Sequence, residues 1–213
     1  MALISVQYNW GPLLYKGKLS SEDIKKILKI CVKNKKWNAV SSLAANIKEE
    51  FFIDQKEFMN ITEKNYHDYI KNFERYYDTA VPNLNLETVW VNYMKAGESN
   101  PPHIHTNCNL SSVWFLKIPN KLKQENSKYK GTVTNGGPGS ICFMHGNFSP
   151  MAIDEVRSFP EEGDFYIFPY NVKHYVSPFI SKCVRVSVAA NYTIDVTNEK
   201  QKTAGFFGSY EKK

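Results

Sequence analysis

The sequence predicts an α+β protein in which helices precede a set of short antiparallel strands. Apolar residues recur at helical spacing in the first part of the chain. From Leu86 onward the pattern changes to short β-branched and aromatic segments that are broken by Gly, Pro or Asn. Many such strands in close succession favour an antiparallel sandwich, barrel or jelly roll, and the segregated helices are then expected to cover one sheet.

The first helix is expected to begin near Ser20, because Asp23 stands three residues later in the arrangement of a capping box. Its buried stripe follows helical spacing and consists of Ile24, Ile27, Leu28 and Cys31. A shorter helical stretch is expected around residues 41–50. A second long helix is expected over "ITEKNYHDYIKNFERYYDT", with Thr62 as its N-cap and His67 on its exposed face.

Length and composition indicate a single soluble globular domain, since the chain has 213 residues, of which 42% are apolar and 23% charged. Much of the formal net charge of +6 comes from a lysine-rich first helix and a lysine-rich tail. Because no stretch interleaves Lys or Arg with aromatic residues, we interpret this charge as solvated surface and not as a nucleic-acid-binding site. No apolar run is long enough to span a membrane.

The four cysteines are widely spread and form no C-x-x-C motif, which argues against a zinc ribbon and a dithiol redox motif. The N-terminal "MALISVQYNW" has neither the basic start nor the long apolar core of a secretory signal. Reduced thiols in the cytoplasm are the simplest expectation. We expect an N-terminal helical support region over residues 1–85, a jelly-roll core over 86–196 and a flexible basic tail over 197–213.

Three of the five histidines suit a metal site. The stretch "NPPHIHTN" places His103 and His105 two residues apart, and side chains at this spacing on a strand point to the same face. His174, in "FPYNVKHYVSP", follows another strand and is the best third ligand. Three ligands on one side of a metal leave the opposite positions open for substrate and oxygen. His145, in "CFMHGN", is expected to lie near the same pocket without binding the metal.

Arg185 lies on the alternating segment "CVRVSVAANY", where it shares one face with Ser187. A lone guanidinium on an otherwise apolar strand is costly unless it meets an anion, and its planar fork suits a carboxylate. Two interpretations stay open on these residues alone. Arg185 binds a carboxylate ligand, or it forms a structural salt bridge with Glu87 or Asp164.

Taken in order, the residues from about Leu86 to Tyr192 resemble the Fe(II)- and 2-oxoglutarate-dependent dioxygenases. The resemblance is greatest to the prolyl-hydroxylase-like branch and to a group of small oxygenases often encoded by phages. The residues that carry it are Trp90, Asn92, Gly97, Asn100, His103, His105, Ser111 or Ser112, Val113, Phe115, Pro119, Phe168, Pro169, His174, Val176, Pro178, Arg185, Ser187 and Asn191.

The resemblance implies a double-stranded β-helix, which is a jelly-roll or cupin-like core, with the N-terminal helices packed on one sheet. It also implies an Fe(II)- and 2-oxoglutarate-dependent dioxygenase that uses O2 and releases succinate and CO2. Such an enzyme would hydroxylate an aliphatic carbon of a protein or small-molecule substrate. The cofactor and cosubstrates carry the oxidative chemistry, and the protein positions them.

Individual roles follow from the resemblance residue by residue. His103 takes the first ligand position of the family's metal motif and His174 takes the last. Arg185 stands where the family binds the 5-carboxylate of 2-oxoglutarate. The other residues implied to line the cofactor pocket are Tyr93, Ser187 and Asn191.

The sequence departs from the family pattern at two positions. His105 occupies the slot of the acidic ligand, so the site would hold three histidines and leave the iron with more positive charge. Phe115 stands where a tyrosine often bonds the 2-oxoglutarate carboxylate. Asp154 or Asp164 could complete the metal shell instead of His105.

Two other functions stay open on the sequence. A three-histidine cupin-type oxygenase that does not use 2-oxoglutarate would suit His105 but would not need Arg185. A non-catalytic jelly-roll binding module would leave the three histidines without a purpose. For the first function, the expected partners are a protein or small-metabolite substrate, with no membrane and no nucleic acid, and self-association as a homodimer is possible. The expected location is the cytoplasm, that of the host cell if a phage encodes the chain.

Overall fold

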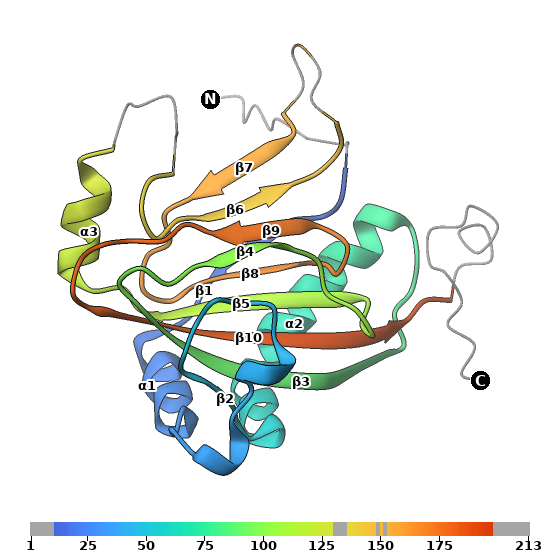
Figure 1. Cartoon of the computed structure of the whole chain (residues 1–213). Coiled ribbons are helices and arrows are strands. Elements are labelled where there is room, and N and C mark those ends of the chain that lie inside the picture. The colour runs from blue at the N-terminus through green and yellow to red at the C-terminus, as the bar shows by residue number, and fades with distance from the viewer. Residues whose placement is uncertain (1–10, 130–135, 148–149, 151–152, 198–213) are drawn as a thin grey trace.

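The computed structural model describes residues 11–129, 136–147, 150 and 153–197, in which two antiparallel sheets face each other. The larger sheet contains, in spatial order, β1 (Tyr15–Lys18), β8 (Asp164–Pro169), β5 (Leu110–Lys117), β10 (Val184–Asp195), β3 (Asn83–Lys95) and β2 (Glu50–Phe52). The smaller sheet contains β4 (Asn100–His103), β9 (Lys173–Val176), β6 (Ile141–Met144) and β7 (Glu155–Ser158). Figure 1 shows the smaller sheet stacked above the larger one.

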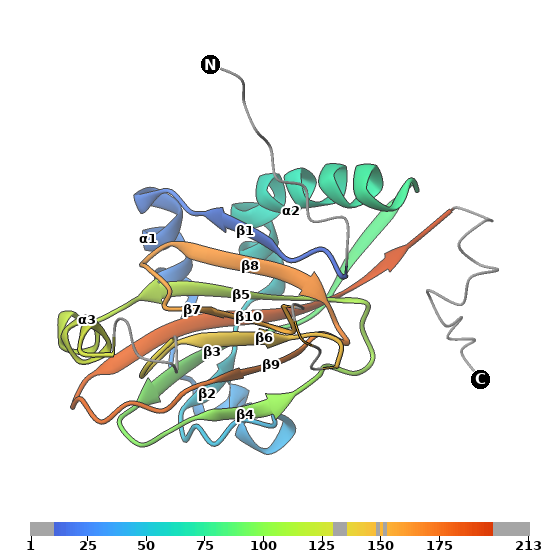
Figure 2. The same ribbon diagram turned by 90° about the horizontal axis from the view of Figure 1, so that it is seen from above.

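Three α-helices accompany the sheets in the described part of the chain: α1 (Ser21–Ile30), α2 (Gln55–Tyr77) and α3 (Asn120–Ser127). Helices α1 and α2 pack on the face of the larger sheet that points away from the smaller sheet (Figures 1 and 2). Two 3₁₀ turns, Lys35–Trp37 and Val40–Ser42, connect α1 to β2. No described helix is both long and apolar enough to cross a membrane.

Alternation along the strands divides the apolar residues between two cores. Val186 and Val188 of β10 pack with the helices, together with the fully buried Trp114 of β5. A second core between the sheets contains Met94 and Phe115, which are the register partners of Arg185 and Ser187. The alternation therefore turns the polar residues of β10 toward the space between the sheets, as the sequence predicts.

The first helix begins where the capping signal predicts, since the Ser20 hydroxyl accepts a hydrogen bond from the Asp23 amide at 3.1 Å. The second helix begins earlier than predicted, at Gln55, because the Asp54 side chain caps it. The assignment of Thr62 as an N-cap was wrong. Thr62 is buried inside the helix, where its hydroxyl donates to the Phe58 carbonyl at 2.8 Å, four residues back.

The expected helix over residues 41–50 was also wrong. This region is largely irregular after its 3₁₀ turn, and Glu50 then begins an edge strand that pairs with β3. Strand β1 was missed as well. It pairs with β8, and Gly17 allows this because an added Cβ there would lie 2.2 Å from the Phe165 ring. Tertiary pairing decides strands β1 and β2, which at four and three residues are too short to show a periodicity of their own.

Candidate metal centre

The three predicted ligands meet at one end of the smaller sheet. His103 ends β4 and lies directly opposite His174 of β9 in the antiparallel register. His105 lies two residues beyond the end of β4, where its amide donates a hydrogen bond to the Tyr170 carbonyl at 3.0 Å. One ring nitrogen from each histidine lies within 4.8 Å of the other two. Pairing between segments seventy residues apart thus builds the cluster that the sequence predicts.

Backbone carbonyls set which ring nitrogen of two histidines carries the proton. The Nδ1–H of His103 donates to the Pro101 carbonyl at 2.7 Å, and the Nδ1–H of His174 donates to the Val172 carbonyl at 2.9 Å. A carbonyl can only accept, so Nε2 of each neutral ring keeps its lone pair. Hydrogen bonds of this kind orient the histidine ligands of metal sites. The Nε2 atoms of His105 and His174 lie 3.2 Å apart, so both face the same point.

All three imidazoles are held in the neutral form that binds metals. Burial, with a contribution from the two neighbouring rings, lowers the pKa of His105 to about 2. Burial and His103 lower the pKa of His174 to about 3, and burial also lowers the pKa of His103. A neutral imidazole keeps one ring nitrogen unprotonated, and the lone pair of that nitrogen can bind a divalent transition metal.

Arg185 is buried in the space between the sheets and has no anionic partner among the described residues. Its side chain is 2% exposed, one Nη donates to the Gly139 carbonyl at 2.9 Å, and its Nε has no hydrogen-bond partner. The guanidinium lies over the Phe115 ring, 5.1 Å from the centroid. Burial lowers the pKa of Arg185 to about 10, so it still carries its charge at neutral pH. The structural salt bridge to Glu87 or Asp164, which the sequence left open as the alternative, is not among the ion pairs of the described residues.

The remaining predicted pocket residues fall on two different faces. Ser187 is buried on the same face of β10 as Arg185. Asn191 lines the cleft beside the histidines and accepts a hydrogen bond from the Ser111 hydroxyl at 2.9 Å. The assignment of Tyr93 was wrong, because this residue faces the helices. Its hydroxyl donates to the Cys31 carbonyl at 2.5 Å, outside the space between the sheets.

The structure also places the other candidate ligands. Asp164 is bound by Lys16 at 3.0 Å and Lys18 at 2.8 Å across the β1–β8 pair, so it is not available to a metal. Asp154 is not part of the histidine cluster. His145 is exposed and is not among the residues that line the described cleft.

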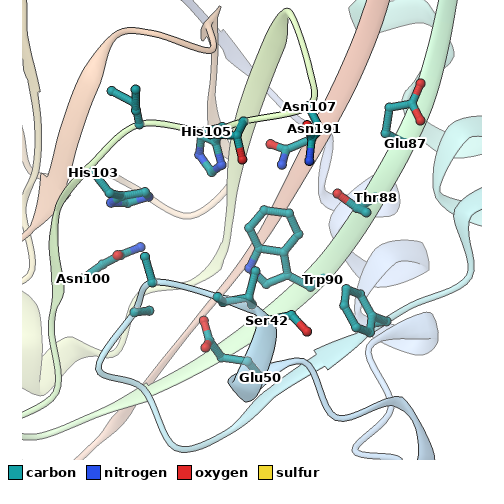
Figure 3. Close-up of a pocket in the computed structure, with 16 residues that line it drawn as sticks. Ser42, Glu50, Glu87, Thr88, Trp90, Asn100, His103, His105, Asn107 and Asn191 are labelled. Atoms are coloured by element: carbon teal, nitrogen blue, oxygen red, sulfur yellow. The ribbon is translucent and has the colours of Figure 1, made fainter. Parts of the chain in front are cut away.

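A cleft of about 440 Å³ opens beside His103 and His105, which is within the usual size of small-ligand sites. Its wall includes Trp90, whose ring centroid lies 6.1 Å from that of His105, and the polar residues Asn100 and Glu50 (Figure 3). Glu50 was not predicted as a site residue from the sequence. The only available signal was a glutamate within the apolar segment "EEFFI", where an alternating strand would bury it.

Comparison with known families gives one match. Residues 88–191 match the model of a family described as "Putative 2OG-Fe(II) oxygenase". The matched segment runs from β3 to β10, so it contains the three histidines and Arg185. A search of curated protein sequences finds no match.

Solved structures with this architecture include three prolyl hydroxylases. A viral collagen prolyl hydroxylase from Paramecium bursaria Chlorella virus-1, in complex with 2OG, aligns with a TM-score of 0.54 at 13% identity and covers 84% of this chain and 94% of its own. A Pseudomonas putida prolyl-4-hydroxylase aligns at 0.54 and 11%, covering 84% and 91%. A Trichoplax adhaerens prolyl hydroxylase, in complex with a hypoxia-inducible-factor peptide, aligns at 0.53 and 14%, covering 91% and 86%. These similarities confirm the predicted jelly-roll fold.

Proposed function

We propose a role for each residue of the site in this protein, whose residues 88–191 belong to the 2OG-Fe(II) oxygenase family. The family makes the protein an Fe(II)- and 2-oxoglutarate-dependent dioxygenase, with O2 as the oxidant. His103, His105 and His174 are proposed to hold the Fe(II). The observation that carries this assignment is the cluster of three neutral imidazoles whose ring nitrogens lie within 4.8 Å of one another.

The described residues suit iron without a carboxylate ligand. Two of the three rings have Nε2 free to bind, because their Nδ1–H groups are bound by carbonyls. Asp164, the alternative ligand, is bound by two lysines. Imidazole ligands suit Fe(II), and an open face of the site leaves room for other ligands. We therefore propose a three-histidine variant of the family's metal site.

Arg185 is proposed to bind the 5-carboxylate of 2-oxoglutarate. A buried guanidinium whose Nε has no partner is costly unless a ligand supplies the missing acceptor. A carboxylate would satisfy this fork through two hydrogen bonds and a charge pair. Ser187 lies on the same face of β10 as Arg185 and is proposed to line the same pocket. Asn191, which lines the cleft beside the histidines, is proposed to line the part of the pocket that adjoins this cleft.

When bound, Fe(II) and 2-oxoglutarate supply the oxidising chemistry, in which R–H, O2 and 2-oxoglutarate give R–OH, succinate and CO2. The protein supplies positioning and exclusion of water. The carbonyls of Pro101 and Val172 fix the orientation of two ligand rings. Phe115 and the second core keep the Arg185 side of the pocket apolar, which strengthens the interaction of its guanidinium with an anion.

The substrate is proposed to be a protein side chain or a small metabolite that enters through the cleft beside His103 and His105. One similar structure holds a peptide, which supports a macromolecular substrate. The four cysteines of the chain are all free, which is consistent with the proposed cytoplasmic location. Self-association as a homodimer also stays a proposal.

Anaerobic titration tests the proposal. The purified protein is loaded with Fe(II), and 2-oxoglutarate is then added. The weak visible metal-to-ligand charge-transfer band of the Fe(II)–2-oxoglutarate complex, called the 2-oxoglutarate band below, is followed. Appearance of the band with saturable 2-oxoglutarate dependence supports the assignment. Metal uptake without the band would favour a three-histidine oxygenase that does not use 2-oxoglutarate. Absence of metal uptake would overturn the ligand assignment. Incubation of the loaded protein with cell extract and O2, followed by mass spectrometry for a gain of one oxygen atom, would identify the substrate.

A further inference from the structure

The wall of the cleft contains a buried carboxyl group that the proposed chemistry does not use. Glu50 of β2 is 1% exposed, and its Oε2 has no hydrogen-bond partner. None of the ion pairs among the described residues includes it. Buried carboxyl groups in proteins are almost always paired or hydrogen-bonded. Glu50 therefore indicates a binding partner beyond the described residues.

Strand pairing directs Glu50 into the cleft. It lies opposite Asn92 of β3, while the next residue, Phe51, packs in the helix-side core. Successive side chains of a strand point to opposite faces, so Glu50 faces the space between the sheets. Figure 3 shows it on the wall below Trp90, across the cleft from His103.

The described lining of this cleft offers hydrogen-bond acceptors and carboxyl groups but no cationic side chain. It contains two carboxyl groups, those of Glu50 and Glu87, and neither Lys nor Arg, although the chain carries a net charge of +6. The Oδ1 atom of Asn100 on the same wall also has no partner. Burial and the charge of Glu98 raise the pKa of Glu50 to about 8, as expected for a carboxyl group with no counter-charge among the described residues, so at neutral pH it is largely protonated in the free protein and would ionise when a cation binds beside it.

We propose that the cleft selects substrates that carry a positively charged nitrogen at the end of an aliphatic chain, with Glu50 as the counter-charge and Asn100 as a further acceptor. This inference rests on the proposed function, because it places the aliphatic part of such a group beside the metal centre. A basic side chain combines an apolar stem with a charged head, and the cleft combines the Trp90 ring with the Glu50 carboxylate.

Calorimetric titration with two matched probes tests this selectivity. Nα-acetyl-lysine amide and Nα-acetyl-norleucine amide share the aliphatic stem and differ in the terminal ammonium. Both are titrated anaerobically into protein loaded with Fe(II) and 2-oxoglutarate. We expect the lysine probe to bind roughly tenfold to a hundredfold more tightly, as for a hydrogen bond to a charged group. Equal binding of the two probes, or tighter binding of norleucine, would overturn the inference.

Two variants assign the preference to one residue. Glu50→Gln keeps the shape of the side chain and removes its charge, so the lysine preference should disappear while thermal unfolding and the 2-oxoglutarate band stay unchanged. Glu57→Gln, on the exposed surface of α2, is the matched control and should keep the preference. A Glu50→Gln protein that still prefers lysine would refute the assignment.

The two levels of the proposal can fail separately. Both probe titrations are therefore repeated with metal-free protein. Absence of the absorption band together with a lysine preference that persists in metal-free protein would count against the proposed function alone. A wild-type protein that gives the band but does not discriminate between the probes would retain the proposed function and lose the substrate class.

Discussion

Replacement of Arg185 by methionine should weaken 2-oxoglutarate binding strongly while leaving the folded protein intact. Methionine keeps much of the length and apolar contact of the side chain and removes the charged fork. Loss of one partner of a buried, hydrogen-bonded charge pair costs about 2–5 kcal/mol. We therefore expect the dissociation constant for 2-oxoglutarate to rise by roughly 30-fold to several thousand-fold. Binding of Fe(II) should change little, because Arg185 is not a proposed ligand.

The same substitution should not lower the free energy of unfolding of ligand-free protein, and it could raise it. Burial lowers the pKa of Arg185 from 12.5 to about 10, which corresponds to about 3 kcal/mol of unfavourable free energy for holding this charge at neutral pH. Loss of the bond to the Gly139 carbonyl costs about 1 kcal/mol. Arg185→Met should therefore be as stable as wild type, or more stable by up to about 2 kcal/mol.

The assay combines the anaerobic 2-oxoglutarate titration with urea unfolding of ligand-free protein. Arg75→Met serves as the control, since Arg75 is exposed near the end of α2 and should alter neither measurement. Unchanged 2-oxoglutarate affinity in Arg185→Met would refute the carboxylate role. A large loss of stability would show instead that the guanidinium serves the fold.

Three further predictions concern the metal ligands and the core. His174→Ala should weaken Fe(II) binding at least roughly a hundredfold in anaerobic titration, and near-normal affinity would contradict its role as a ligand. The folded-state pKa values of His105 and His174 lie below 6.5, so under acid conditions the unfolded chain binds protons that the folded chain does not. Stability of ligand-free protein should therefore fall by about 2–3 kcal/mol between pH 7 and pH 5.5, and replacing both rings with Asn should remove this component from the urea-unfolding profile. Phe58→Ala should cost about 3–5 kcal/mol in urea unfolding because Phe58 is fully buried against Trp114, whereas Trp37→Ala, at a half-exposed ring, should cost much less.

The sequence allowed the chemistry-bearing residues to be predicted better than their supports. The alternation around Arg185 is a local pattern that strand geometry converts directly into a shared face. The spacing of His103 and His105 predicted the right pair, but His105 lies beyond the end of β4 and is held there by its bond to the Tyr170 carbonyl. Tyr93 was assigned to the pocket from its position in the family pattern, which does not show to which face of β3 its side chain points. Its neighbour Met94 faces the second core, so Tyr93 must face the helices.

Other features depend on partners distant in the sequence. The role of Glu50 arises only when β2 pairs with β3, and β2 is too short to show a periodicity. The cap of α2 was missed because Asp54 and Thr62 are both residue types that suit an N-cap. In the fold, the Asp54 side chain accepts from the Glu57 amide in the first turn, whereas Thr62 lies inside the helix and donates to the Phe58 carbonyl. The two lysines that bind Asp164 come from β1, a strand that no local pattern predicted.

The pairing of β1 and β2 with the two ends of the large sheet has a practical consequence for anyone dividing this chain. An excised fragment spanning only residues 88–191 would lack both flanking strands, helix α1, and helix α2, whose Phe58 and Tyr66 rings contact Trp114. Its exposed edges and apolar face would favour aggregation. Expression for biochemical work should therefore retain the segment that precedes residue 88, because the oxygenase motif depends on it for a soluble scaffold.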